Sequence, residues 1–441
     1  MNQPITRRGF LRSSAQSAAA LAALHAISAD TRGEEKLQPI RLGLIGCGGM
    51  MQYHAKGMIE RKSPVVFAYL CDVDPEQSDK IARAVSGFQS LAPRQTQRYE
   101  DVLDDRDVEA VVIATPHHWH MPIALRAIQA SKDVYVEKPA SHVFREGQLL
   151  IEEARKHNRV VQHGTQMRSS PVMTLAGKLL KDGILGEVKM AKAWNVQRRD
   201  ARPVVADSDP PVGVDYDRWL GPAPHRMFNA NRFHVNWRAF PEYGNGTIGD
   251  DGVHDLDIAR WGLGIETHPV RITGHSSSIV YNNPEYPDNM SVTYQYDGNK
   301  VLLYEDRQFA PYGLDGFDSG NAFYGSEGYM IFSRRGYFQV YLGPKADKGP
   351  GVPAELRGPR SRGYEEHMNN FLECVRTRQP TNATSEIAHL SCSLVHLGDI
   401  ACRTQTVLEF DPARELVTNH PKANELLSKN YRAPYGLPKN G

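Results

Sequence analysis

The sequence predicts an α/β protein with an N-terminal, doubly wound parallel sheet and a C-terminal α/β domain whose large open sheet is mostly antiparallel or mixed. Apolar strands at 110–114 and 134–136 flank a helix-periodic segment at 121–130, and a crossover of this length makes the two strands parallel. A strand at 41–45 runs into a glycine-rich turn and a helix. Beyond residue 270, runs of alternating apolar and polar residues are typical of an antiparallel or mixed sheet.

The composition narrows the class of protein. The chain has 441 residues, enough for two domains with a sizeable core. Its 52 Lys and Arg against 51 Asp and Glu leave no charged field for nucleic acid or acidic lipid, so neither partner is expected. The odd count of five cysteines shows no disulfide framework. No window reaches the roughly 18 apolar residues that a membrane span needs.

Residues 1–29 have the pattern of an export signal. Arg7 and Arg8 precede Phe10 and a mild apolar run that ends in small residues near 26–29. This pattern is typical of a twin-arginine signal, whose route carries folded proteins, and it predicts a periplasmic location. The alternative is an amphipathic tail with two chance arginines.

The glycine-rich turn after the first strand predicts a dinucleotide site. Gly46 and Gly48 let the turn form and a pyrophosphate approach. Met51 replaces the third glycine of this motif, so the helix at 52–61 is expected to stand slightly off the strand. The second strand ends in Asp72, which is placed to accept a bond from a ribose 2′-hydroxyl. Asp72 favours NAD over NADP, with NADP still possible, and its alternative role is that of a turn residue.

The strands at 110–114 and 134–136, with the helix between them, form the central unit of the predicted sheet. Polar residues follow both strands, at 115–120 and at 137–139. They lie at the carboxyl edge of the sheet, where ligands of open α/β sheets bind. The residues expected to bind the cofactor are Gly46, Gly48, Gly49, Met50, Asp72, Thr115, Pro116, His118, His120, Glu137 and Lys138. This domain spans 38–165 and the C-terminal domain 166–441.

The elements outside the central unit follow from hydrophobic periodicity. Helices are expected at 75–85, 99–103, 144–157, 172–182, 364–376 and 385–403, and a loop at 216–224. Strands are expected at 65–71, 159–164, 186–194, 270–275, 291–296, 300–304, 329–333 and 337–341. The tail from residue 406 is expected to dock through Leu426, Leu427 and Tyr431.

A helical pattern that begins at Asp250 carries candidate catalytic groups. Asp250 and His254 lie one turn apart on one face, so Asp250 is expected to orient His254 and stabilise its charge. Hydride transfer to a nicotinamide needs a base for the hydroxyl proton and a group that holds the developing alkoxide. His254 suits the first role and Lys138, at the sheet edge, the second.

Further side chains suit a sugar substrate, with a metal site as the alternative. The residues expected to meet substrate are Lys138, Arg168, Trp194, Arg238, Asp250 and His254, with Trp119, Trp219 and Trp237 able to cover a sugar face. The histidines His117, His118, His120 and His254 could instead suggest a metal site. His118 and His120 lie two apart in an expected loop, without metal-ligand spacing, so we expect no metal.

Taken together, Gly46-x-Gly48, 114–120, Glu137-Lys138-Pro139 and Asp250-x-x-x-His254-x-x-Asp257 resemble the Gfo/Idh/MocA family, the group of glucose–fructose oxidoreductase and inositol dehydrogenase. The resemblance implies an N-terminal Rossmann domain, a C-terminal domain on a large open sheet, NAD or NADP, and sugar or polyol substrates. It also implies that Lys138 is the catalytic lysine, that His254 is the general base with Asp250 as its partner, and that a cis bond precedes Pro139.

The sequence therefore predicts an exported, NAD(P)-dependent oxidoreductase that moves a hydride between a nicotinamide and a sugar or polyol hydroxyl. One alternative is a glycoside hydrolase that oxidises its substrate transiently and retains NAD. Another is a non-catalytic sugar-binding protein with a structural cofactor, against which the intact Lys138, Asp250 and His254 argue. The resemblance also implies a homo-oligomer, a dimer or tetramer.

Overall fold

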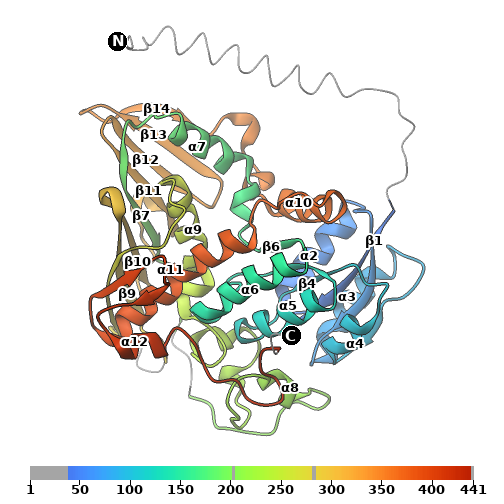
Figure 1. Cartoon of the computed structure of the whole chain (residues 1–441). Helices are drawn as coiled ribbons and strands as arrows, with labels where there is room; N and C mark the ends of the chain where they lie inside the picture. Colours follow the sequence, from blue (N-terminus) through green and yellow to red (C-terminus); the bar gives the residue numbers. More distant parts are fainter. Residues whose placement is uncertain (1–37, 201–203, 281–284, 439–441) are drawn as a thin grey trace, which may run out of the picture. The chain divides into compact units, whose positions relative to one another are not determined.

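In the computed structural model, which describes residues 38–200, 204–280 and 285–438, the first domain is built on a six-stranded sheet (Figure 1). Every strand pair in it is parallel, and the strand order is β3-β2-β1-β4-β5-β6. The strands are β1 (Ile40–Ile45), β2 (Val65–Cys71), β3 (Arg94–Thr96), β4 (Ala110–Ile113), β5 (Asp133–Val136) and β6 (Val161–His163). This order confirms the predicted parallel sheet and reverses direction between β1 and β4, where such sheets bind ligands. The predicted export signal lies outside the described residues.

Helices cover both faces of this sheet, as the doubly wound prediction requires. One face buries side chains of α2 (Gly49–Glu60), α3 (Pro75–Val85) and α10 (Tyr364–Thr377). The other face packs against α4 (Tyr99–Asp104), α5 (His117–Gln129) and α6 (Phe144–Lys156). Helix α10 comes from beyond the predicted domain boundary at 165, so the later part of the chain completes the core of the first domain.

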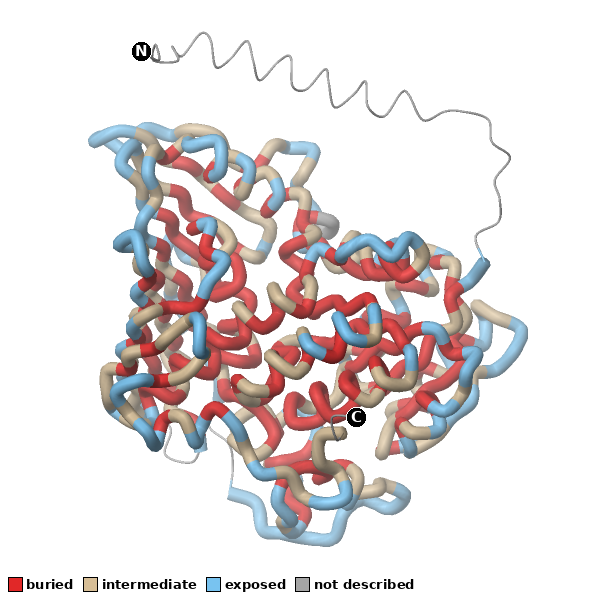
Figure 2. The backbone as a smooth tube through the Cα atoms, in the orientation of Figure 1, coloured by how far each residue is buried: buried red, intermediate tan, exposed pale blue. Residues whose placement is uncertain are grey.

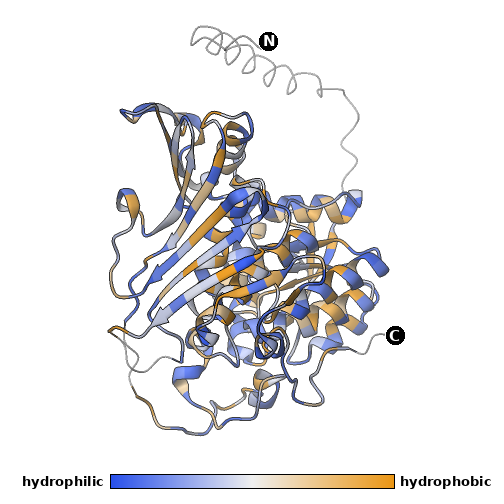
Figure 3. Ribbon diagram, turned by 60° about the vertical axis from the view of Figure 1, so that its left-hand side comes forward, coloured by the Kyte–Doolittle hydropathy of each residue, from blue (hydrophilic) through white to orange (hydrophobic). Residues whose placement is uncertain are grey.

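The second domain contains a ten-stranded mixed sheet of order β14-β13-β12-β11-β7-β10-β9-β8-β15-β16, whose strands fan out in Figure 3. Only β7 and β10 pair in parallel among its described strands. The strands are β7 (Val188–Asn195), β8 (Arg271–Ser277), β9 (Asn289–Tyr296), β10 (Lys300–Arg307), β11 (Ser319–Gly325), β12 (Gly328–Ser333), β13 (Tyr337–Leu342), β14 (Asp347–Gly351), β15 (Leu408–Asp411) and β16 (Leu416–Val417).

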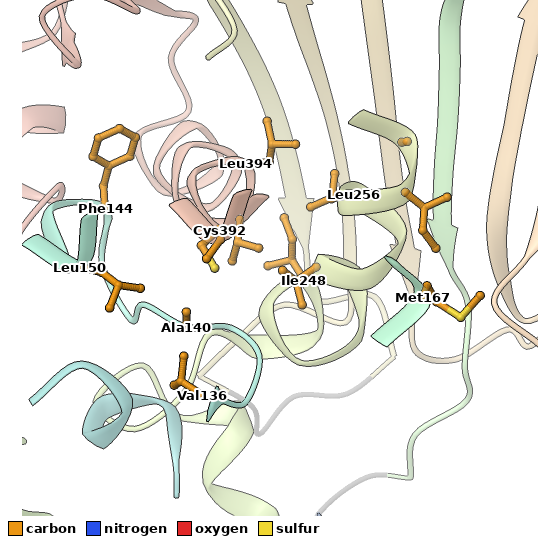
Figure 4. Close-up of a cluster of buried hydrophobic side chains, with 14 of the residues drawn as sticks. Val136, Ala140, Phe144, Leu150, Met167, Ile248, Leu256, Cys392 and Leu394 are labelled. Atoms are coloured by element: carbon orange, nitrogen blue, oxygen red, sulfur yellow. The ribbon is translucent and has the colours of Figure 1, made fainter. Parts of the chain in front are cut away.

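A shared hydrophobic core joins the two sheets. Helices α7 (Pro171–Lys181), α9 (Val253–Gly262) and α11 (Ser385–Thr404) contribute to it, and Figure 2 shows the buried backbone continuing from one domain into the other. Figure 4 shows Phe144 and Leu150 of α6 in the same cluster as Leu256 of α9 and Leu394 of α11. Among the described residues, no helix combines the length and apolar character needed to cross a bilayer.

Several elements differ from the prediction for local reasons. Helix α5 begins at His117 rather than 121, and Pro122 lies inside it as the sixth residue, where the proline ring removes one backbone hydrogen bond of the helix. Where a loop was expected, α8 (Tyr216–Leu220) forms because the Asp215 side chain accepts the backbone N–H of Arg218 and caps it. Strand β11 escaped prediction because it begins with the weak strand formers Ser319 and Gly320.

Two regions near the site and the C-terminus complete the fold. Met51 is fully buried in the core beneath α2, so the side chain in place of the third glycine packs inside the protein. The tail contains the short helix α12 (Pro421–Glu425), and Leu427 is fully buried, as predicted, whereas Leu426 is exposed. The hydroxyl of Tyr431 donates to Glu146 of α6 at 2.8 Å, which docks the tail on the first domain.

Candidate active site

A cleft of about 700 Å³ opens at the carboxyl edge of the six-stranded sheet and extends under residues of the second domain. Most of the predicted site residues line it: Gly46, Gly48, Gly49, Met50, Asp72, Thr115, Pro116, His120, Glu137, Lys138, Arg238 and Asp250. They come from the ends of β1, β2, β4 and β5 and from the segment before α9. Both predicted polar clusters of the central unit therefore meet in one place.

The glycine turn is shaped for an anionic ligand. Gly46 has a φ of +83°, and a Cβ there would lie 2.7 Å from the backbone nitrogen of Thr115, so only glycine fits. A Cβ on Gly48 or Gly49 would meet no described atom within 4 Å, which leaves this side of the turn open to the cleft. The N-terminus of α2 has no side-chain cap in the described structure, so its backbone N–H groups are available to a phosphate. The turn therefore fits a dinucleotide pyrophosphate.

Asp72 both holds the turn and faces the cleft. Its Oδ2 accepts the backbone N–H of Cys47 at 2.6 Å, and its Oδ1 accepts that of Asp74 at 2.9 Å. Burial raises the pKa of Asp72 to about 6, because these two hydrogen bonds do not fully offset desolvation. Asp72 can therefore serve both as a turn residue and as an acceptor for the ribose hydroxyls.

At the other end of the cleft, Lys138 is paired with Asp250. The Lys138 Nζ donates to Asp250 Oδ1 at 3.0 Å and also to the Asp250 carbonyl oxygen. The Arg238 Nε donates to the same Oδ1 at 2.8 Å. Burial alone would raise the pKa of Asp250, but Lys138 and Arg238 hold it well below its usual value, so it is an anion between two cations. The peptide bond between Lys138 and Pro139 is cis, as the resemblance implied.

The structure corrects the expected pairing of Asp250 with His254. The hydrogen bonds of the Asp250 carboxylate come from Lys138 and Arg238, because charged donors bind a carboxylate more strongly than a neutral imidazole does. His254 is buried and is not among the residues that line the cleft, and its Nδ1 has no hydrogen-bond partner among the described residues. Burial, reinforced by Lys138 and Arg334, places the pKa of His254 well below 6.5, so the imidazole is neutral at pH 7. Asp250 acts on His254 only through its charge, which partly opposes this shift.

Glu137 holds the backbone of Lys138 in place. Its Oε1 lies 2.8 Å from Nε2 of His54, and its Oε2 accepts the backbone N–H of Lys138 at 3.2 Å. Burial alone would raise the pKa of Glu137, but its contacts with His54 and Lys138 hold it below the ordinary value. A Cβ on Gly164 would lie 2.9 Å from this carboxylate, so the glycine leaves room for it.

The histidines that follow β4 have mainly structural roles. His120 lies at 2.7 Å from the carbonyl oxygen of Pro139 and at 2.8 Å from that of Thr115, so it bridges the ends of β5 and β4. His118 lies between the carbonyl oxygens of Trp219 and Tyr243, and burial lowers its pKa to about 3. It does not line the cleft, so the structure does not support its predicted contact with the cofactor.

Two further predicted substrate residues, Arg168 and Trp194, also lie away from the cleft. Arg168 is buried in a bidentate pair with Asp257, with N–O distances of 2.8 to 3.0 Å, so its donors are already engaged. Trp194 is fully buried in a cluster separate from the one that takes in Ala191 and Ala193 of the same strand, because alternate side chains of a strand point to opposite faces. Neither residue lines the cleft.

The sequence analysis predicted only part of a rim that runs over the cleft: it named Trp119, Trp219, Trp237 and Arg238 for a sugar substrate and missed Phe233, His234 and Val235. Phe233, His234, Val235 and Trp237 line it beside Arg238, whose guanidinium lies 4.4 Å from the Trp237 ring. Trp119 and Trp219 line it as well, as do Gln197, Arg199 and Asp251. The missed residues lie in a loop whose position depends on contacts with the first domain, such as that between His234 and Asp74.

The fold and the cleft together define an NAD-binding oxidoreductase of the two-domain type. Comparison with known families agrees, and the chain belongs to the Gfo/Idh/MocA oxidoreductase family. The model of its NAD-binding Rossmann fold matches residues 40–165. The model of its C-terminal α/β domain matches residues 181–324 and 357–437.

Named relatives are distant but extend over most of the chain. Levoglucosan dehydrogenase of Pseudarthrobacter phenanthrenivorans is 23% identical over 359 residues, 72% of this chain and 83% of that protein. The scyllo-inositol 2-dehydrogenase (NAD(+)) of Bacillus subtilis is 24% identical over 343 residues, 76% of this chain and 86% of that protein. A solved levoglucosan dehydrogenase in complex with NADH and levoglucosan has a TM-score of 0.67 at 19% identity and covers 84% of this chain and 99% of its own, which shows the shared fold.

The Asp72 carboxylate is expected to set both cofactor choice and its pH dependence. Because the ribose hydroxyls need an ionised acceptor, NAD affinity should be constant at pH values well above the Asp72 pKa of about 6 and fall as the pH drops through that pKa. Asp72→Ser should weaken NAD binding about 10- to 100-fold, the worth of hydrogen bonds to a charged group, and narrow the preference over NADP. Fluorescence titration with both nucleotides from pH 5 to 8 measures this, and wild-type protein that binds NADP as tightly as NAD contradicts it.

Proposed function

We propose that this protein is an exported, NAD-dependent oxidoreductase that transfers a hydride between the nicotinamide and a hydroxyl-bearing carbon of a sugar or polyol. The observation that carries the proposal is the group Lys138, Asp250 and Arg238 at the carboxyl edge of the sheet, together with a buried, neutral His254 whose pKa the charge of Lys138 helps to lower. These are the acid–base components that alcohol oxidation needs.

Each residue has a distinct task. Bound NAD supplies the hydride acceptor. His254, neutral above its lowered pKa, takes the hydroxyl proton at an imidazole nitrogen. Lys138 donates a hydrogen bond to the oxygen as negative charge develops there. Asp250 and Glu137 hold Lys138 in place from its ammonium and backbone ends, and Arg238 keeps Asp250 ionised.

The sugar or polyol class rests on the relatives and on the cleft. The relatives named above act on levoglucosan and scyllo-inositol. In this chain, the aromatic rings of Trp219 and Trp237 share the cleft with the polar groups of Gln197 and Asp251. Aromatic faces and hydrogen-bonding side chains together match the C–H faces and hydroxyls of a sugar ring.

A screen of sugars, polyols and anhydrosugars with NAD tests the proposal. The absorbance of reduced nicotinamide should rise with at least one of them. Release of a chromogenic aglycone without net reduction of NAD would instead mark a cofactor-retaining glycosidase. Saturable sugar binding with neither reaction would mark a binding protein.

Export is part of the proposal and follows from the pattern at residues 1–29. Changing Arg7 and Arg8 together to lysine is expected to keep the protein in the cytoplasm with its leader uncleaved, because the twin-arginine route needs both guanidinium groups. Cell fractionation and the mass of the recovered protein measure this, with Arg12→Lys as the matched control that should still be exported. Normal export of the double variant would contradict the assignment.

A further inference from the structure

A second cluster of potential ligands lies outside the cleft, where the C-terminal hairpin meets α6 and α11. The Nε2 of His268 lies 2.8 Å from Oε1 of Glu415, and the Nε2 of His389 lies 3.0 Å from the same oxygen. The three ligand atoms all lie within 4.8 Å of one another. His268 precedes β8, His389 is on α11 and Glu415 is in the turn between β15 and β16, so three separate elements converge.

The surrounding hydrogen bonds show which atoms carry protons. The Ser393 hydroxyl donates to the carbonyl oxygen of Leu390 at 2.9 Å. Its oxygen therefore accepts the bond from Nδ1 of His268, 3.0 Å away. A neutral His268 with its proton on Nδ1 presents a lone pair at Nε2, directly toward the carboxylate oxygen of Glu415. The Nε2 of His268 and the Oε1 of Glu415, 2.8 Å apart, can share either a proton or a metal ion.

The ligand set and its support favour a metal ion. Two imidazoles and one carboxylate are a common protein ligand set for Zn²⁺. His268 has the second partner on its ring, Ser393, that metal-bound histidines need. The Gln148 amide nitrogen donates to the other oxygen of Glu415, and Arg145 fixes the amide orientation by donating to Gln148 Oε1 at 2.8 Å. Glu415 is thus held on both sides.

The cluster also has the apolar wall and the space that a metal site needs. The centroid of the Phe144 ring lies 5.4 Å from the centroid of the His268 ring and 4.9 Å from that of the His389 ring. A Cβ on Gly147 would lie 2.2 Å from Nδ1 of His389, so glycine in α6 lets this ring fit. Tetrahedral zinc holds its ligand atoms about 3.3–3.5 Å apart, so each histidine would move a few tenths of an ångström away from Glu415, from the present 2.8 and 3.0 Å. Glu415 lies on a partly exposed turn that can make this adjustment.

We propose that His268, His389 and Glu415 bind a zinc ion, with water as the fourth ligand, and that the zinc fastens the C-terminal hairpin to α11 and, through Gln148, to α6. The expectation that the chain holds no metal, which came from the histidines of the cleft, then applies only to the cleft. No residue of this site lines the cleft, so zinc should raise stability without changing the chemistry of the active site.

Chelator-treated protein titrated with zinc chloride tests the proposal. Wild type should bind about one zinc per chain by elemental analysis, and its Tm should rise with zinc concentration. Ser393→Ala should weaken zinc binding about 10- to 100-fold, as expected for loss of a partner of a ligating histidine. Glu415→Gln and His389→Gln should lose both the bound zinc and the rise in Tm, and circular dichroism confirms that they fold.

Glu425→Gln is the matched control, since Glu425 is an exposed carboxylate of the same tail and should leave zinc binding unchanged. Zinc bound equally by wild type and Glu415→Gln would overturn the proposal. So would wild type that takes up no zinc, in which case a proton bridges His268 and Glu415. Because the readouts are zinc content and Tm, a wrong assignment of the catalytic residues would not affect the result.

Discussion

His254→Ala is expected to lower kcat about 10²- to 10⁴-fold, the usual contribution of a positioned general base. The side chain is buried, its Nδ1 has no partner among the described residues, and burial and the charge of Lys138 place its pKa well below 6.5. It is therefore a neutral acceptor across the physiological pH range. NAD affinity should change little, because His254 lies in the second domain and is not among the residues that line the cleft.

A matched control separates the loss of a base from the loss of packing. His396 is also buried and neutral, with its pKa lowered to about 3 by burial, and its Nε2 lies 3.0 Å from the Ser141 hydroxyl outside the cleft. His396→Ala should lower Tm and leave the kcat of the folded protein nearly unchanged. If His254→Ala turned over within a few-fold of wild type, the general base would have to be another residue.

Lys138→Ala is expected to lower kcat about 10²- to 10³-fold, the usual cost of removing one donor to a developing oxyanion. It should also change the pH profile. Lys138 is a cation that lowers the pKa of His254, so its removal raises that pKa. The acid limb of the remaining activity should therefore move to higher pH. Stopped-flow measurement of nicotinamide reduction from pH 4 to 9 records both effects.

Lys138→Arg is the control for charge. It keeps the cation, so the acid limb should stay in place, while kcat still falls because a planar guanidinium does not reproduce the position of the ammonium. The double variant Lys138→Ala/His254→Ala should lose much less than the product of the single losses, because both residues act on one hydroxyl. Independent, multiplicative losses would show that the two residues serve different steps.

Much of the fold could be predicted from local pattern. The strand Val65–Cys71 and the helix Pro75–Val85 have the bounds that their apolar runs and turn residues predict. Errors arose where one capping residue decides the outcome, as Asp215 does for α8, or where a strand contains weak strand formers, as β11 does. The packing of α10 into the first domain depends on contacts between distant parts of the chain, which no local pattern records.

The candidate site divides in the same way. Lys138, Asp72 and Asp250 could be found because short motifs place them at the ends of strands and helices. The partners of Asp250 could not be predicted, because a carboxylate binds whichever cations the fold brings near it. Here these cations are Lys138 and Arg238. Trp194 was misplaced because the face of the sheet on which a side chain lies depends on strand register, and a shift of one residue reverses it.

The most direct test of the central claim is the fate of a deuterium placed on the reacting carbon of the substrate. The account predicts that wild-type protein transfers the deuterium to the nicotinamide, so that mass spectrometry finds it in the reduced nucleotide in step with the oxidised product. His254→Ala and Lys138→Ala should carry out the same transfer at the lower rates given above. Oxidised product with no deuterium in the nucleotide, or product formed with no net reduction of NAD, would contradict it.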